Sequence, residues 1–221
     1  MNKKIILTGI IGVIGACLMY AGDMFLYFTN EPILNFEEEI VGIMGDVSQN
    51  RLIVGGLLGP VSTLLYMIGF YHIYLLIKPV NGRTAAVIFI LLCFGILYGG
   101  AFHSHFTFLG FISSVENAEL LQMAENYSIL NFNFMFIPSL IAYICFAYLV
   151  VTKKTFHPRW MIAFTPIVLF WFAGAMKLLP QPLMMLIAGG WSNIVFVIFF
   201  SVSTILAAKN GYGKLAMVRQ S

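Results

Sequence analysis

The chain has 221 residues, of which 60% are hydrophobic and 10% are charged, and its mean hydropathy is +0.92. So few polar residues cannot coat a water-soluble globule of this size, which excludes an ordinary soluble protein and favours one that is embedded in a lipid bilayer. The net charge is +3, but the lysines and arginines are spread over short separate segments, and this excludes a nucleic-acid-binding face.

Six apolar runs are long enough to cross a bilayer core of about 30 Å as helices that rise about 1.5 Å per residue. They cover residues 5–28, 52–77, 84–114, 129–151, 160–179 and 183–208. Short alternating strands separated by turns, the pattern of an outer-membrane barrel, do not occur in the sequence. We therefore predict an all-α, single-domain bundle of six transmembrane helices.

Two connecting segments are predicted to form amphipathic helices on the outer membrane surface. Asn35 with Glu38 is a capping-box pattern, and it is followed by apolar residues at helical spacing, namely Phe36, Ile40, Met44 and Val47. Ser113 with Glu116 is a second such pattern, followed by Leu120, Leu121, Ala124 and Tyr127. Either helix could cover a pocket or simply close the bundle.

The charges predict the orientation of this bundle. Nine acidic residues lie toward one side of the six-helix arrangement, and ten of the 12 basic residues lie on the other. Short loops rich in Lys and Arg stay in the cytoplasm, so both termini are expected there. The ten basic residues are Lys3, Lys4, Lys78, Arg83, Lys153, Lys154, Arg159, Lys209, Lys214 and Arg219.

Two of these basic loops, Lys78-Pro79-Val80 and residues 153–160 with the sequence KKTFHPRW, resemble those of small uncharacterised bacterial membrane families with six helices. The resemblance covers most of the chain and implies its topology, that of a multi-pass protein of the inner membrane. It implies no activity, so function must be inferred from the ionisable residues within the spans.

Three ionisable residues share the outer part of the predicted bundle. Counted from the inner helix ends, Asp23, His103 and Lys177 lie about 26 to 28 Å along their helices. A charge in hydrocarbon needs a partner or water. We therefore expect Asp23 to be held by a residue of another helix, with His103 favoured over Lys177.

Further polar residues extend this group. Asn133 lies near the start of the fourth helix, and Asn193 is about 15 Å down the last one, while Tyr20 and Tyr27 share a helix face with Asp23. His105, two residues after His103, is included in the predicted pocket. The sequence thus predicts an outward-facing polar pocket that binds or moves a small molecule or a lipid, or serves a partner protein. His72, near the cytoplasmic surface, is expected to be structural.

Two alternatives remain open at this point. In the first, there is no pocket, because Lys177 reaches the headgroups and Asp23 reaches interfacial water. In the second, Asp23, His103 and His105 bind zinc in a membrane-embedded hydrolase. Residues two apart lie about 200° around a helix, so His103 and His105 share a site only if the third helix breaks. We therefore favour binding without a cofactor over catalysis.

Overall fold

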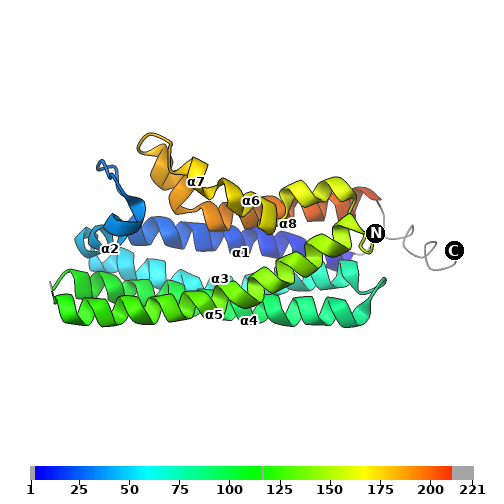
Figure 1. The fold of residues 1–221 in the computed structure, drawn as a ribbon, viewed down its shortest axis with the longest axis horizontal. Coiled ribbons are helices and arrows are strands. Elements are labelled where there is room, and N and C mark those ends of the chain that lie inside the picture. The colour runs from blue at the N-terminus through cyan, green and yellow to red at the C-terminus, as the bar shows by residue number, and fades with distance from the viewer. Residues whose placement is uncertain (1–2, 116, 211–221) are drawn as a thin grey trace.

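The computed structural model describes residues 3–115 and 117–210, which form an all-helical bundle (Figure 1). Five long helices run along it: α1 (Lys3–Tyr27), α3 (Gln49–Ile77), α4 (Gly82–Ser113), α5 (Ala118–Val151) and α8 (Trp191–Asn210). Each is apolar and long enough to cross a membrane. A shorter helix, α2 (Phe36–Asp46), lies at one end. The start of α1 and the end of α8 lie together at the opposite end (Figure 1).

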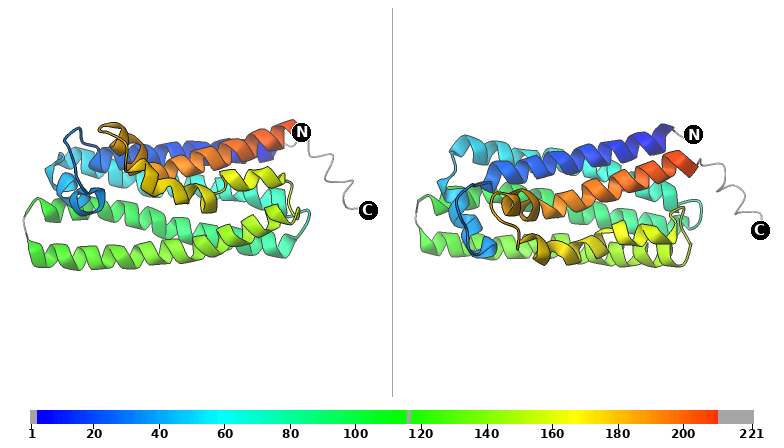
Figure 2. Two further views of the ribbon diagram at one scale, coloured as in Figure 1. Left: turned by 45° about the horizontal axis from the view of Figure 1, so that its top comes forward. Right: turned by 90° about the horizontal axis from the view of Figure 1, so that it is seen from above.

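The predicted fifth span, residues 160–179, is not a continuous helix. It consists of a 3₁₀ helix, η1 (Arg159–Phe164), then α6 (Pro166–Leu169), a second 3₁₀ helix, η2 (Phe170–Phe172), and α7 (Ala173–Met176). The first break falls at Thr165, which is extended, because a residue before proline avoids the helical conformation. The described residues thus contain five long helices rather than the six that were predicted. The broken segment, which was predicted as the fifth span, lies beside α8 (Figure 2).

The last helix begins later than predicted. Regular α8 starts at Trp191 rather than near residue 183, and a π-helical turn, η3 (Met185–Gly189), precedes it. Side chains satisfy the carbonyls of this irregular backbone: the Tyr20 hydroxyl donates to Leu186 O and the Tyr27 hydroxyl to Gly189 O, both at 2.9 Å. These two carbonyls therefore have hydrogen-bond partners although they lie in an irregular turn.

The two expected surface helices have different outcomes. The first one forms as α2: Asn35 caps it by accepting the N–H of Glu37, while the Glu39 carboxylate, rather than that of Glu38, accepts the N–H of Asn35. The second is instead the beginning of α5, which Asn117 caps by accepting the N–H of Leu120. Ser113 ends α4, and Glu116 lies outside the described residues, as do Lys214 and Arg219.

Small residues let the helices approach closely. A methyl group on Gly12 of α1 would lie 2.8 Å from the Cα of Gly69 in α3, so neither position accepts a larger side chain without movement.

Arg51, at the start of α3, donates to the carbonyls of Met24 and Phe28 at the end of α1. A cation there satisfies the free carbonyls that end a helix. Arg51 therefore fixes α3 against α1.

Candidate functional site

The Asp23 carboxylate lies inside the bundle and has partners on two other helices. Asp23 is 6% exposed. One carboxylate oxygen, Oδ1, lies 3.2 Å from His103 Nε2 on α4. The other, Oδ2, accepts a 2.6 Å hydrogen bond from the side-chain amide of Asn193 on α8. The structure thus places His103 and Asn193, rather than Lys177, beside this carboxylate.

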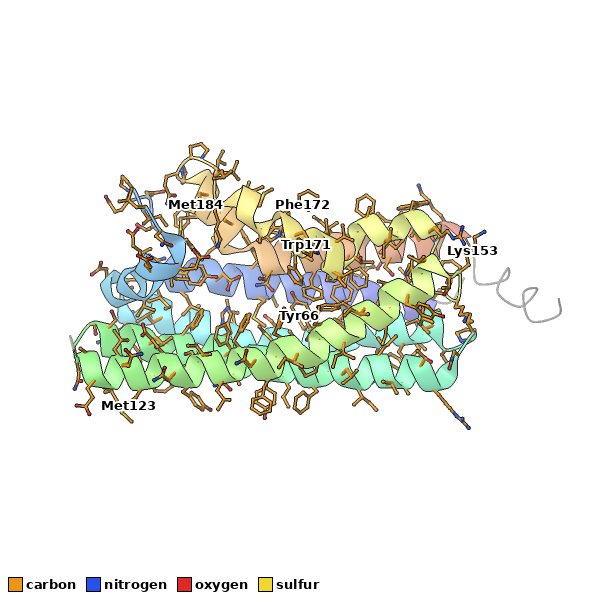
Figure 3. All side chains as sticks on the ribbon, in the orientation of Figure 1. Tyr66, Met123, Lys153, Trp171, Phe172 and Met184 are labelled. Atoms are coloured by element: carbon orange, nitrogen blue, oxygen red, sulfur yellow. The ribbon has the colours of Figure 1, made fainter. Side chains whose placement is uncertain are left out.

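Asn193 is held in turn by α3. Its Oδ1 accepts a 2.7 Å hydrogen bond from the hydroxyl of Tyr66, which is fully buried in the middle of the bundle (Figure 3). Because the amide oxygen is engaged in this way, the amide NH₂ faces Asp23. Four helices therefore contribute to one buried polar group, which we call the Asp23 cluster: Asp23, Tyr66, His103 and Asn193.

The His103 ring occupies a slot between α1 and α3 that two glycines create. A methyl group on Gly22 would lie 2.7 Å from its Cε1, and one on Gly59 would lie 3.1 Å from its Nδ1. The 3.2 Å contact with Asp23 is within ion-pair range, but its alignment does not satisfy hydrogen-bond geometry, so neither ring nitrogen has a hydrogen-bond partner among the described residues. Asp23 is therefore the charged side chain that the structure places beside this ring.

The Asp23 cluster lies on the wall of a cavity of about 310 Å³. Most of the wall is apolar and aromatic. Phe132 and Phe136 line it from α5 and are also exposed, at 41% and 43%, so the cavity is open on that side of the bundle. Its other aromatic and sulfur-containing lining residues are Met19, Tyr27, Phe70, Phe102, Phe106, Met135, Tyr143, Phe170 and Phe196.

The residues predicted for the pocket divide into two groups. Asp23, His103, Asn193 and Tyr27 line the cavity. The position of Asn193 beside Asp23 differs from its expected depth, because the turn before Trp191 takes up residues that the sequence assigned to the last helix.

The remaining four predicted residues are elsewhere. Tyr20 holds the π-helical turn instead of facing the cavity. His105 points to α5, where its Nε2 contacts Ala124 O at 3.1 Å. Asn133 is exposed on α5. Lys177 pairs with Glu37 of α2 at the surface of the bundle.

The alternative zinc site is not assembled. It requires three convergent ligands, and His105 is turned away from Asp23 and His103, as expected for residues two apart on an unbroken helix. Within residues 3–115 and 117–210, no three His, Cys, Asp or Glu side chains are grouped so that they could hold a metal ion. The three predicted ligands therefore do not converge in this part of the chain.

A second polar cluster, which the sequence reading did not predict, lies at the other end of the bundle. Ser203 Oγ of α8 lies 2.8 Å from His72 Nε2 and 2.8 Å from His157 Nε2. His72 Nδ1 contacts Ile5 O at 2.8 Å, and His157 Nδ1 contacts Thr155 Oγ1 at 3.2 Å. We call these side chains the Ser203 cluster. His72 is thus buried and paired, and it does not line the cavity.

The chain was compared with known proteins. It matches a family of unknown function, DUF6796, over residues 1–210. No curated protein and no solved structure gives a match. Because the match spans nearly the whole bundle, including both polar clusters, the chain belongs to the family of unknown function DUF6796.

Proposed function

We propose that this chain is a multi-pass protein of the bacterial inner membrane whose central cavity binds a small amphiphilic molecule and holds or moves it within the bilayer. The observation that carries this proposal is a buried carboxylate on the wall of a largely aromatic cavity. A mostly apolar pocket with a few convergent polar groups is the usual form of a small-molecule site.

The distribution of charges supports the membrane orientation in this proposal. Eight of the ten described basic residues lie at the end of the bundle where α1 begins and α8 ends (Figure 1), namely Lys3, Lys4, Lys78, Arg83, Lys153, Lys154, Arg159 and Lys209. The other two, Arg51 and Lys177, lie toward the opposite end, where they contact the end of α1 and α2. The acidic α2 lies at the opposite end. With the basic end in the cytoplasm, the broken segment between α5 and α8 completes the sixth passage, and both termini are cytoplasmic.

The open side of the cavity favours a ligand that enters from the lipid. Phe132 and Phe136 lie in the apolar part of α5, which would face hydrocarbon rather than water. A molecule with an apolar body could pass between α5 and the broken segment and place its polar head at the Asp23 cluster. A lipid or another membrane-soluble amphiphile meets this requirement, whereas a strongly hydrated solute does not.

A cavity-filling substitution tests this function. Gly99 lines the cavity, and a methyl group there would lie 3.2 Å from the flexible Met135 Sδ, so Gly99→Leu should fold and occupy part of the volume. We expect it to weaken binding of an uncharged dansyl-labelled octyl amide at least tenfold, about 1.4 kcal/mol. The measurement is probe fluorescence with purified protein in detergent micelles.

The matched control is Gly42→Leu in α2, where an added methyl group would meet no atom within 4 Å. This variant should bind the probe like the unmodified chain. Equal binding by both variants and the unmodified protein would show that the probe occupies only the micelle or the outer surface, and the proposed function would then be wrong.

A further inference from the structure

The cavity has a simple charge composition. Among its described lining residues, Asp23 is the one carboxylate and His103 the one imidazole. Arg51 and Lys177 do not line the cavity and are engaged elsewhere, Arg51 with carbonyls of α1 and Lys177 with Glu37. The described wall of the cavity therefore holds one carboxylate beside one imidazole, which is cationic only when both of its nitrogens carry a proton.

Other titratable groups face the Asp23–His103 pair as neutral hydroxyls. They are Tyr27 from α1, Tyr66 from α3 and Tyr143 from α5, and tyrosines titrate near pH 10. From α8 the pair faces the uncharged Asn193, and from α4 it receives no second histidine, because His105 is turned toward α5. The proton of the cavity is thus shared between one imidazole and one carboxylate, with no further histidine or acid in the described wall.

The His103 ring has a carboxylate on one side only. Asp23 Oδ1 lies 3.2 Å from Nε2, and Nδ1 has no hydrogen-bond partner among the described residues. Asn193 supplies a neutral donor to the other carboxylate oxygen and adds no charge. In surroundings that exclude water, one carboxylate balances one positive charge, and a second positive charge nearby is strongly disfavoured.

We propose that the amphiphile has a cationic head, such as an ammonium group, and that its binding releases the proton of His103. This inference rests on the proposed function of the cavity. The cation pairs with Asp23, the proton leaves His103 Nε2 for bulk water, and the net charge of the cavity is unchanged. Aromatic walls such as Phe102, Phe170 and Phe196 can also stabilise a cation through their ring faces. Cation and proton are then exchanged at one carboxylate.

This exchange predicts a pH dependence that an uncharged ligand does not share. A rise in pH removes the competing proton, so affinity for a permanent cation should increase, by up to tenfold per pH unit where the imidazolium predominates. Octyltrimethylammonium and octanol are suitable probes, since neither changes its own charge. Each is measured between pH 5 and 8 by displacement of the dansyl-labelled octyl amide.

Two histidine variants provide a matched comparison on one helix. His103→Gln should leave octyltrimethylammonium binding independent of pH, whereas His105→Gln, on the same helix but facing α5, should retain the full pH dependence. Asp23→Asn should remove the preference for the cation over octanol. If His103→Gln does not fold, proton release provides the readout: the unmodified protein in weak buffer should release protons with octyltrimethylammonium and none with octanol.

The outcomes separate this inference from the proposed function. If Gly99→Leu blocks the uncharged amide but octyltrimethylammonium binds no better at pH 8 than at pH 5, the cavity is a binding site and the cation exchange is wrong. A pH dependence that survives in His103→Gln also overturns the exchange. If Gly99→Leu has no effect on any of the three probes, the proposed function itself fails.

Discussion

The two polar clusters of this bundle are both buried, but they differ in whether their histidines have hydrogen-bond partners. The Ser203 cluster is closed, with His72 fully buried and His157 2% exposed, and none of its members lines the cavity. The Asp23 cluster is also buried, but it forms part of the cavity wall and leaves both nitrogens of His103 without a hydrogen bond. The rings of His72 and His157 thus have hydrogen-bond partners in the protein, whereas the ring of His103 does not.

The hydrogen bonds of the Ser203 cluster can be ordered along a single direction. His72 Nδ1 must donate to the carbonyl of Ile5, so its Nε2 accepts the Ser203 hydroxyl proton. Ser203 Oγ then accepts the N–H of His157, whose Nδ1 accepts from the Thr155 hydroxyl. Every donor and acceptor in this chain is matched while both rings are neutral, so the cluster joins α1, α3, α8 and the segment after α5 as a structural element. We therefore interpret the Ser203 cluster, whose polar groups are all hydrogen-bonded, as structural. We interpret the Asp23 cluster, whose His103 ring has no hydrogen bond and lies in a cavity wall, as a binding site.

The largest expected effect breaks the closed cluster. Ser203→Val replaces the hydroxyl with apolar methyl groups, so it leaves His72 without a donor and His157 without an acceptor. Two buried unpaired groups should cost about 2 to 6 kcal/mol of unfolding free energy, measured by denaturant titration with circular dichroism in detergent micelles. Binding of the octyl amide to the folded protein should be unchanged.

Thr204→Val is the control for this prediction. Thr204 is adjacent on α8 and buried, but its Oγ1 has no hydrogen-bond partner among the described residues. Loss of that hydroxyl should be neutral or slightly stabilising. A loss below about 1 kcal/mol in Ser203→Val would contradict a structural role for the cluster.

Acid should weaken the closed cluster next. Burial, together with the neighbouring His72 ring, lowers the pKa of the His157 imidazole from 6.5 to about 3. Below pH 6.5 the unfolded chain therefore takes up a proton that the folded chain excludes, so stability is full above this pH and falls progressively until about pH 3. Between pH 6.5 and 4.5, His157 should account for a loss of about 2 kcal/mol.

The measurement for this prediction is unfolding free energy against pH for the unmodified protein and for His157→Gln. The variant should show a shallower decline over this interval, because it lacks the excluded proton. If unfolding free energy declined equally with falling pH in the two proteins, His157 would be in contact with water. The Ser203 cluster would then not be closed, and the contrast with the Asp23 cluster would be wrong.

A smaller effect should appear in the open cluster. Asp23 and His103 contact each other. The loss of unfolding free energy in the double variant Asp23→Ala with His103→Ala should therefore differ from the sum of the two single losses by about 0.5 to 3 kcal/mol. Asp23→Ala with Lys177→Ala is the matched control, and those costs should add within about 0.5 kcal/mol, because Lys177 pairs with Glu37. Additivity in the first cycle would show that Asp23 and His103 do not act as a pair.

The sequence predicted the long helices well and the broken segment poorly. Apolar runs of bilayer length correspond to α1, α3, α4, α5 and α8, because a helix that is apolar over much of its surface is recognisable from composition. Residues 160–179 are equally apolar, so composition alone could not separate a broken segment from a helix. Pro166 is a local signal for the break. A proline near the start of a helix costs little, however, so its presence does not by itself exclude a continuous helix.

The candidate site was predicted in part for a comparable reason. Helical rise placed Asp23 and His103 at one depth, and the structure brings these two side chains together. His105 was also assigned to the pocket, but it faces α5, because residues two apart lie about 200° around a helix. The helical rise gives the depth of a residue but not which helices are neighbours. Lys177 was therefore assigned to the pocket although it pairs with Glu37 of α2, and Tyr66 was left out although it bonds Asn193. His157 and Ser203 could not be found, since they meet only when the segment after α5 folds back onto α8.

The sequence by itself determined the helical class, the apolar lengths and the segregation of charge, because each of these depends on residue type at regular spacing along one chain. Only the tertiary structure decided which polar groups become paired. The slot for His103 between Gly22 and Gly59, and the amide of Asn193 turned by Tyr66 toward Asp23, need four helices in register. Such contacts depend on packing between distant segments, and no local pattern in the sequence encodes them.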